Sequence, residues 1–156
     1  MEEDDHAGWM QELGPRDAAL VRAFRTAAVA LGRGCDEHGA RARAELATLT
    51  APGEHRDTVE HFWALMTTIG SRAQRQIRFH VPDCPCLGDD EAAFLRLCAH
   101  LRSGERVRAQ RHAALLVPHD ATDRLLHHAA VIARRCRSGT APSSAMADSR
   151  GAVRLH

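Results

Sequence analysis

The chain has 156 residues, a length that suits a single domain with a substantial buried core. Its 21 basic and 20 acidic residues leave a formal net charge of +1 at pH 7, without the basic excess typical of proteins that bind nucleic acid or anionic membranes. All the basic residues are arginines, and lysine, asparagine and tyrosine are absent, as expected for a bacterial protein encoded by a GC-rich gene. We therefore read little function into any single arginine.

No segment approaches the roughly 20 consecutive apolar residues that a membrane-spanning helix needs. The N-terminus is acidic, whereas signal and transit peptides carry basic residues. We therefore expect a soluble, cytoplasmic protein. In a reducing compartment its five cysteines are expected to be free or metal-bound thiols rather than disulfides.

Helical spacing of apolar residues predicts six helices. We expect them at about 15–31, 36–49, from 57 or 58 through 69, from 89 or 90 to 104, 105–117 and from 120 through 136. Residues 1–12 are acidic and expected to fray, although Trp9 and Met10 could dock onto the body. Residues 137–150 are rich in Ser, Gly, Ala and Pro, a composition that predicts a flexible segment.

Between the third and fourth helices the apolar period changes from helical to two. Ile77, Phe79 and Val81 alternate with polar residues, which predicts a short strand over 76–81. A strand needs a partner to pair with. The next segment, 82–88, contains two prolines and is expected to form a rigid loop.

The chain also contains an internal repeat. Residues 13–24 match 87–98 at five of twelve positions, and 47–66 match 113–132 at six of twenty. The repeat predicts a mainly α fold built as a duplicated three-helix unit, with 13–80 as the first repeat and 81–136 as the second. Each unit would be followed by a short strand, the second at 151–156, and the two strands could pair. The alternative is that Ala- and Arg-rich amphipathic helices resemble one another by composition alone.

One cluster has the spacing of metal ligands. His80, Cys84 and Cys86 form a His-x3-Cys-x-Cys sequence, and imidazole and thiolate are the ligands that zinc prefers. Cys98, in the next predicted helix, is our candidate for the fourth ligand. The alternative is a surface loop with two unligated thiols, with Cys98 and Cys136 as small buried hydrophobic residues.

Other histidines and cysteines give weaker signals. His61 and His127 occupy equivalent positions in the repeat and could bind a metal together, although histidine is common at the edge of a helical core. His127 and His128 are expected to point to opposite sides of their helix. Cys35 lies in a turn beside Asp36, whose charge argues against a reactive thiolate.

No sequence motif of a hydrolase, a nucleotide-binding enzyme or a zinc protease occurs, so catalysis has little support. We expect a small regulatory or accessory protein that binds a partner protein, with structural zinc at His80, Cys84 and Cys86. Arginine-rich helix faces, such as the one around Arg106 and Arg108, could meet an acidic partner. One alternative is a thiol- or metal-responsive sensor; another is a metal-dependent enzyme with an open coordination position. A homo-oligomer is compatible with each of these.

Overall fold

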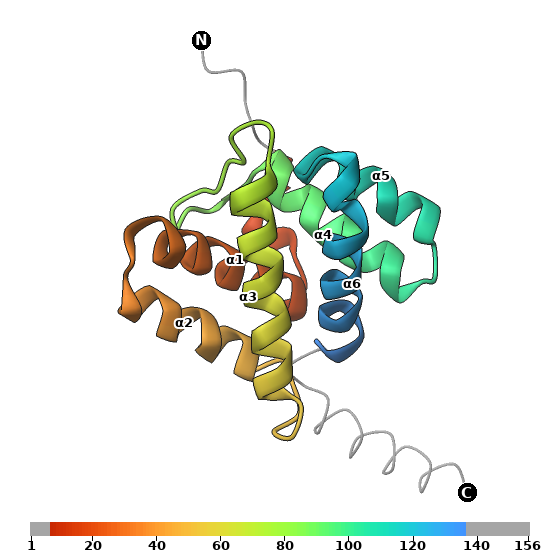
Figure 1. Ribbon diagram of the computed structural model, residues 1–156. Coiled ribbons are helices and arrows are strands. Elements are labelled where there is room, and N and C mark those ends of the chain that lie inside the picture. Colours follow the sequence, from red (N-terminus) through yellow and green to blue (C-terminus); the bar gives the residue numbers. More distant parts are fainter. Residues whose placement is uncertain (1–6, 137–156) are drawn as a thin grey trace, which may run out of the picture.

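The computed structural model describes residues 7–136 and confirms a mainly helical protein with six α-helices in that range (Figure 1). The helices are α1 (Pro15–Arg33), α2 (Asp36–Ala47), α3 (His55–Arg72), α4 (Asp89–Arg102), α5 (Arg106–Leu116) and α6 (His119–Arg135). A short 3-10 helix, η1 (Met10–Glu12), and two very short strands, β1 (Gly8–Trp9) and β2 (Cys86–Leu87), complete the described elements. Within this range no helix is long and apolar enough to cross a membrane.

The helix ends follow from local chemistry. Pro15 occupies the first turn of α1, where a missing amide costs nothing, and Gly34 ends it in the left-handed conformation at φ 64°. Helix α4 begins with Gly88 as its N-cap, and Asp89 and Asp90 lie in its first turn. Their negative charges are favourable there because they face the positive end of the helix dipole.

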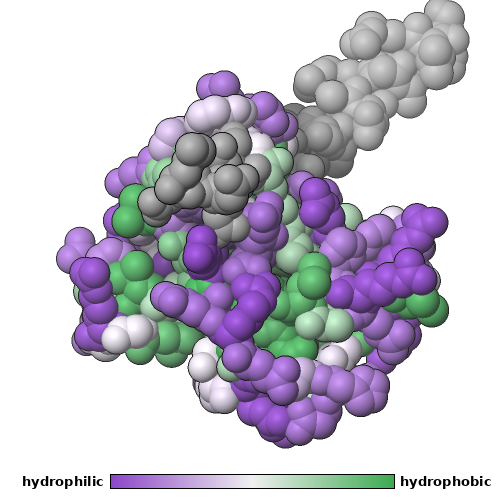
Figure 2. Space-filling view, turned by 90° about the horizontal axis from the view of Figure 1, so that it is seen from above, coloured by the Kyte–Doolittle hydropathy of each residue, from purple (hydrophilic) through white to green (hydrophobic). Residues whose placement is uncertain are grey.

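The helices pack as two hairpins around a central pair (Figure 1). Helix α1 packs along α2, α4 packs along α5, and α3 packs along α6. The apolar faces of all six helices form one core, whose largest fully buried apolar side chains include Leu20, Phe24, Phe62, Phe94 and Leu125. Figure 2 shows hydrophilic side chains over most of one face of the molecule, with separate areas of hydrophobic residues between them.

The predicted strand at 76–81 is wrong, because this segment is neither helix nor strand. The observed sheet instead pairs β1 with β2 in antiparallel register, Gly8 opposite Leu87 and Trp9 opposite Cys86. Carboxylate side chains rather than a neighbouring strand bind the amides of Arg78 and His80 in this segment. Its expected partner at 151–156 lies outside the described residues, as does the segment expected to be flexible.

The segment between α3 and α4 is held against the core by an aromatic contact. The Phe24 ring stacks on Phe94 with 4.3 Å between ring centroids, which joins α1 to α4. Phe79 meets the edge of the same Phe24 ring at 4.7 Å. This contact fixes one point of the loop 73–85 above α1.

The left-handed turn after α1 gives a test of the fold. Replacing Gly34 with alanine should lower the free energy of unfolding by about 1–2 kcal/mol, because an added Cβ disfavours this conformation. Gly32→Ala is the matched control: it lies in the same helix without positive φ and with open space around it, and should raise the free energy by about 0.5–1 kcal/mol. Urea unfolding of the two variants measures both effects. Changes of the same sign would contradict the assigned helix end.

Candidate functional site

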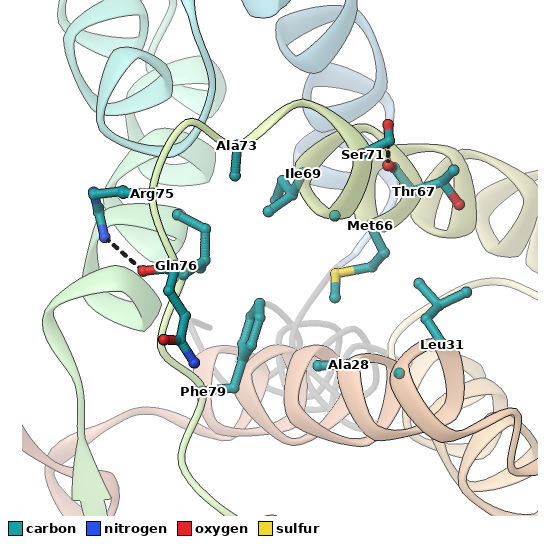
Figure 3. Close-up of a pocket in the computed structure, with 13 residues that line it drawn as sticks. Ala28, Leu31, Met66, Thr67, Ile69, Ser71, Ala73, Arg75, Gln76 and Phe79 are labelled. Atoms are coloured by element: carbon teal, nitrogen blue, oxygen red, sulfur yellow. Dashed lines mark hydrogen bonds between the residues drawn. The ribbon is translucent and has the colours of Figure 1, made fainter.

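An open apolar cleft of about 570 Å3 lies between α1, α3 and the loop that follows α3 (Figure 3). Its apolar lining includes Leu31 from α1, Met66 and Ile69 from α3, and Ile77 and Phe79 from the loop. The volume lies within the range of about 300–1,000 Å3 that is common for ligand pockets. The cleft can therefore take up several apolar groups of a ligand or partner.

The rim of the cleft includes an exposed leucine and an arginine. Leu31 is 49% exposed, unusual for a large apolar side chain beside a cavity. Arg75 is the one charged residue that lines the cleft among the described residues, and no acidic residue lines it. The cleft thus combines apolar walls with one arginine at its edge.

The loop behind the cleft is anchored by an ion pair that is completely buried. Arg25 of α1 and Glu91 of α4 both have 0% exposed side chains, and the Arg25 Nε lies 2.8 Å from the Glu91 Oε1. Arg25 Nη2 donates to Glu91 Oε2 at 2.9 Å, which makes the pair bidentate. Arg25 also donates to the carbonyl oxygens of Cys84 at 2.8 Å, Pro82 at 3.5 Å and Cys86. All five N–H donors of the guanidinium are thus used.

Glu91 holds the loop from the other side. Its carboxylate accepts the backbone N–H of His80 at 3.0 Å and that of Gly88 at 2.9 Å, and the His80 ring nitrogen Nδ1 lies 3.3 Å from it. Burial alone would raise the pKa of Glu91, but the hydrogen bonds from Arg25, Gly88 and His80 outweigh it and hold the pKa below its ordinary value. Glu91 is therefore a carboxylate at neutral pH.

A second anchor fixes the part of the loop that lines the cleft. Arg75 makes a bidentate pair with Asp90, at 2.5 and 3.0 Å, and donates to the carbonyl oxygen of Leu115 at 2.8 Å. Asp90 also accepts the backbone N–H of Arg78 at 2.8 Å. Burial raises the pKa of Asp90, but the hydrogen bonds from Arg75 and Arg78 lower it by more. The pKa of Asp90 therefore lies below its ordinary value. The cleft wall is thus tied to both α4 and α5.

The structure does not gather the four predicted metal ligands. Cys84 and Cys86 are partly exposed in the loop, and His80 faces Glu91. Cys98, on α4, is fully buried in the protein core, and this burial raises the pKa of its thiol to about 12. Within residues 7–136, the side chains whose potential metal-ligand atoms do come together, within 4.8 Å of one another, lie elsewhere in the fold. Zinc at His80, Cys84 and Cys86 stays a prediction.

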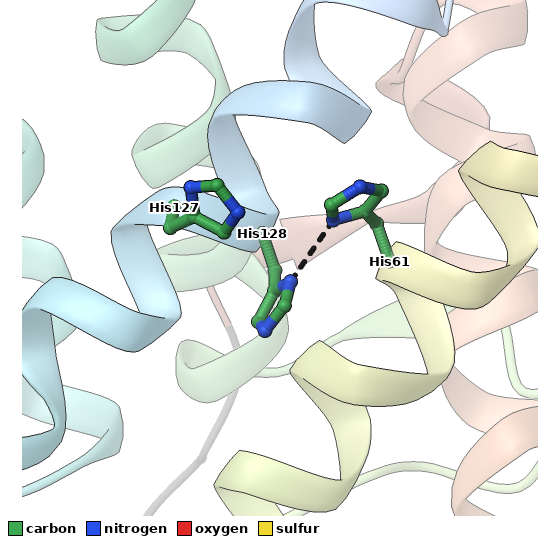
Figure 4. Close-up of side chains that lie close together, drawn as sticks. All are labelled: His61, His127 and His128. Carbon is green, nitrogen blue, oxygen red and sulfur yellow. Dashed lines mark hydrogen bonds between the residues drawn. The ribbon is translucent and has the colours of Figure 1, made fainter.

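The side chains whose ligand atoms come together form a cluster of three histidines between α3 and α6 (Figure 4). The Nδ1 atoms of His61 and His128 lie 3.0 Å apart, and the His127 ring centroid is 5.6 Å from that of His61 and 5.2 Å from that of His128. The expectation that His127 and His128 point to opposite sides of their helix is wrong, because neighbouring side chains on a helix diverge by about 100° rather than 180°. Burial, with His61 and His127 nearby, lowers the pKa of His128.

Comparisons with models of protein families, with curated proteins and with solved structures found no match for the chain.

Sequence reasoning missed Arg25, because an all-arginine composition made each arginine look uninformative. The position held a signal, since Arg25 lies among the apolar residues of α1 that form its buried face. A charged residue on such a face requires a buried partner. Glu91, three residues after Gly88, lies in the first turn of α4, where an acidic residue is common and does not by itself indicate a distant partner.

The anchor makes a strong prediction about stability. Arg25→Met should lower the free energy of unfolding by about 3–5 kcal/mol, because it leaves Glu91 buried and unpaired. The matched control Arg22→Met, on the same helix, breaks a part-exposed pair with Glu45 and should cost at most about 1 kcal/mol. Chemical denaturation of both variants measures the difference.

A double variant distinguishes the stability that comes from the ion pair itself from the stability that comes from its hydrogen bonds to the loop. Replacing a buried pair by apolar residues is often harmless. Here Arg25→Met with Glu91→Met would also strip partners from the carbonyl groups of Cys84 and Cys86 and the N–H groups of His80 and Gly88. Since each unsatisfied group costs about 1–3 kcal/mol, the double variant should remain strongly destabilised. Wild-type stability in the double variant would contradict the anchoring role.

The two lowered pKa values predict sensitivity to acid. Because Glu91 and Asp90 have pKa values below the ordinary 4.5 and 3.8, their stabilisation is complete above those values and is lost as the pH falls through the folded-state values. Unfolding measured from pH 6 downward should show a falling free energy. Asp90→Asn should reduce this slope, whereas Glu60→Gln, with a 66% exposed side chain, should leave it unchanged. Equal slopes in all three proteins would refute this account.

Proposed function

We propose that this chain is a small regulatory or accessory protein that binds a partner protein through the cleft between α1, α3 and the loop after α3. The observation that carries the proposal is an open apolar cleft with a half-exposed Leu31 at its edge. Contiguous apolar surface on a soluble protein commonly marks an interaction site. The double anchor of the loop supports the proposal, because a wall held in place pays little ordering entropy on binding.

The occupant we propose is an amphipathic helix of the partner, with acidic residues beside its apolar face. Helix grooves in other proteins accept apolar side chains spaced three and four residues apart. Arg75 lines the cleft, and Arg72 and Arg78 flank it in sequence, so a negative charge on the occupant would meet arginines. Arg75 and Arg72 already pair with Asp90 and Asp120, so this attraction serves orientation more than affinity.

The arginine face of α5 gives less support. Arg106 lies 3.8 Å from Asp123, and Arg108 lies 2.8 Å from Glu105. These exposed pairs satisfy the arginines within the protein itself, as on an ordinary solvated helix. The cleft therefore remains the better candidate interface.

We also propose that the fold arose by duplication of a three-helix unit, with 13–80 and 81–136 as the two copies. Two features support this. In each copy a glycine with positive φ, Gly34 or Gly104, lies between the first two helices. The equivalent residues His61 and His127 also lie side by side where the third helices pack, as expected near a twofold axis.

A second candidate function is control of the cleft by the chemistry of the cysteine loop. Cys84 and Cys86 are part-exposed thiols whose carbonyl groups bind Arg25. Oxidation of these thiols, or zinc bound with His80, would move the same loop that lines the cleft. The further hypothesis of a metal-dependent enzyme stays a prediction.

Site-specific photo-crosslinking in cells tests the cleft. A crosslinker placed at Leu31 should capture one defined partner, and the purified partner should bind the wild-type chain with measurable affinity. Val107 is the matched control, because it is an exposed apolar residue, at 65%, near the start of α5 and does not line the cleft. Leu31→Asp should weaken binding of the purified partner at least tenfold by placing a charge at the apolar edge.

The control variant Val107→Asp should bind that partner with wild-type affinity. Equal capture from both positions, or equal affinities of the two aspartate variants measured by calorimetry, would rule out the cleft as the interface.

A further inference from the structure

We infer that His61, His127 and His128 form a binding site for one divalent transition-metal ion of the Zn2+, Co2+ and Ni2+ class, joining α3 to α6. The three side chains reach the same space from two helices, as Figure 4 shows. This site is separate from the cleft and from the cysteine loop, so it does not rest on the proposed function.

The spacing of the nitrogen atoms suits such an ion with small movements. A tetrahedral zinc ion with Zn–N bonds of about 2.0–2.1 Å places its ligands about 3.3 Å apart. The His61 and His128 Nδ1 atoms are already 3.0 Å apart, and all three ligand atoms lie within 4.8 Å of one another. His127 is exposed, so its ring can turn inward without disturbing the core.

The carboxylate of Asp57 lies near the first candidate ligand, His61. With Nδ1 of His61 facing His128, its other nitrogen, Nε2, lies 3.8 Å from Asp57 one turn earlier on α3. Asp57 is in turn bound by Arg135 of α6. Histidine ligands of metals usually donate their second N–H to such an acceptor, which fixes the ring and its tautomer. The cluster thus has three candidate ligands and a carboxylate near one of them.

The donor set decides the class of ion. Three imidazole nitrogens suit zinc, cobalt, nickel or copper, whereas calcium and magnesium prefer oxygen. Three protein ligands also leave a coordination position for water or another group. Without metal, the contact between His61 and His128 needs one nitrogen to donate and the other to accept. When metal binds both Nδ1 atoms, the proton on one of them moves to Nε2 of the same ring, and both rings stay neutral.

Calorimetric titration of the full, tag-free chain with Zn2+ tests the inference. We expect one ion per chain and a rise in the thermal midpoint of about 5–10 °C when free Zn2+ is 100-fold above Kd. His61→Gln, His127→Gln and His128→Gln should each lower the affinity at least tenfold. Asp57→Asn should lower it by about 10–100-fold, through the position of His61.

Two controls separate this site from others on the chain. His119→Gln removes another exposed histidine of α6 and should leave the affinity unchanged. A double variant, Cys84→Ser with Cys86→Ser, should also bind normally, and the Co2+ complex of the wild type should lack thiolate charge-transfer absorption. Zn2+ binding lost with the cysteines but not with the histidines would overturn the inference. So would the absence of binding at millimolar Zn2+.

Discussion

The buried pair of Arg25 and Glu91 is the interaction on which the rest of the structure depends. Two charges removed from water cost several kcal/mol each, and their attraction compensates only when geometry is good and the remaining hydrogen-bonding groups find partners. Here the guanidinium uses all five donors and the carboxylate accepts two backbone amides besides. The pair therefore satisfies backbone groups of the segment 80–88, of which only the two residues of β2 pair with another strand.

This arrangement explains how an irregular segment can form one wall of a cleft. A loop held only by apolar contacts would open easily, because exposed backbone hydrogen bonds and few buried groups make for low local stability. The segment after α3 is instead fixed at three places: by Arg75 with Asp90, by Phe79 on Phe24, and by the buried pair. Both the part of the segment that lines the cleft and the part that carries the cysteines are therefore held in place. The cleft wall and the cysteines consequently belong to one loop that is held by a connected set of contacts.

The sequence predicted the helices well because apolar periodicity is a local signal and the core requires it. The pairing of strands and the ion pairs between distant residues are not local signals. A period of two in 76–81 indicated an extended chain but could not show what would bind its amides. Arg25 and Glu91 are 66 residues apart, so only the packed fold reveals that they meet. The repeat came closest to a site: it singled out His61 and His127, yet His128 has no histidine counterpart in the first copy and needed the geometry of α3 against α6.

Helix α3 links the two proposed sites, because His61 lies on its first half and Met66 and Ile69 line the cleft from its second half. A ligand shifts a conformational equilibrium only if it binds the two states with different affinity. Metal at the histidines would hold α3 to α6, whereas the cleft is formed by α3 with α1 and the loop. The two sites therefore act independently if α3 stays in place, and become coupled only if α3 moves as a rigid body relative to α1. Partner affinity measured with and without bound metal reports on that motion directly, because no other described helix supplies residues to both sites.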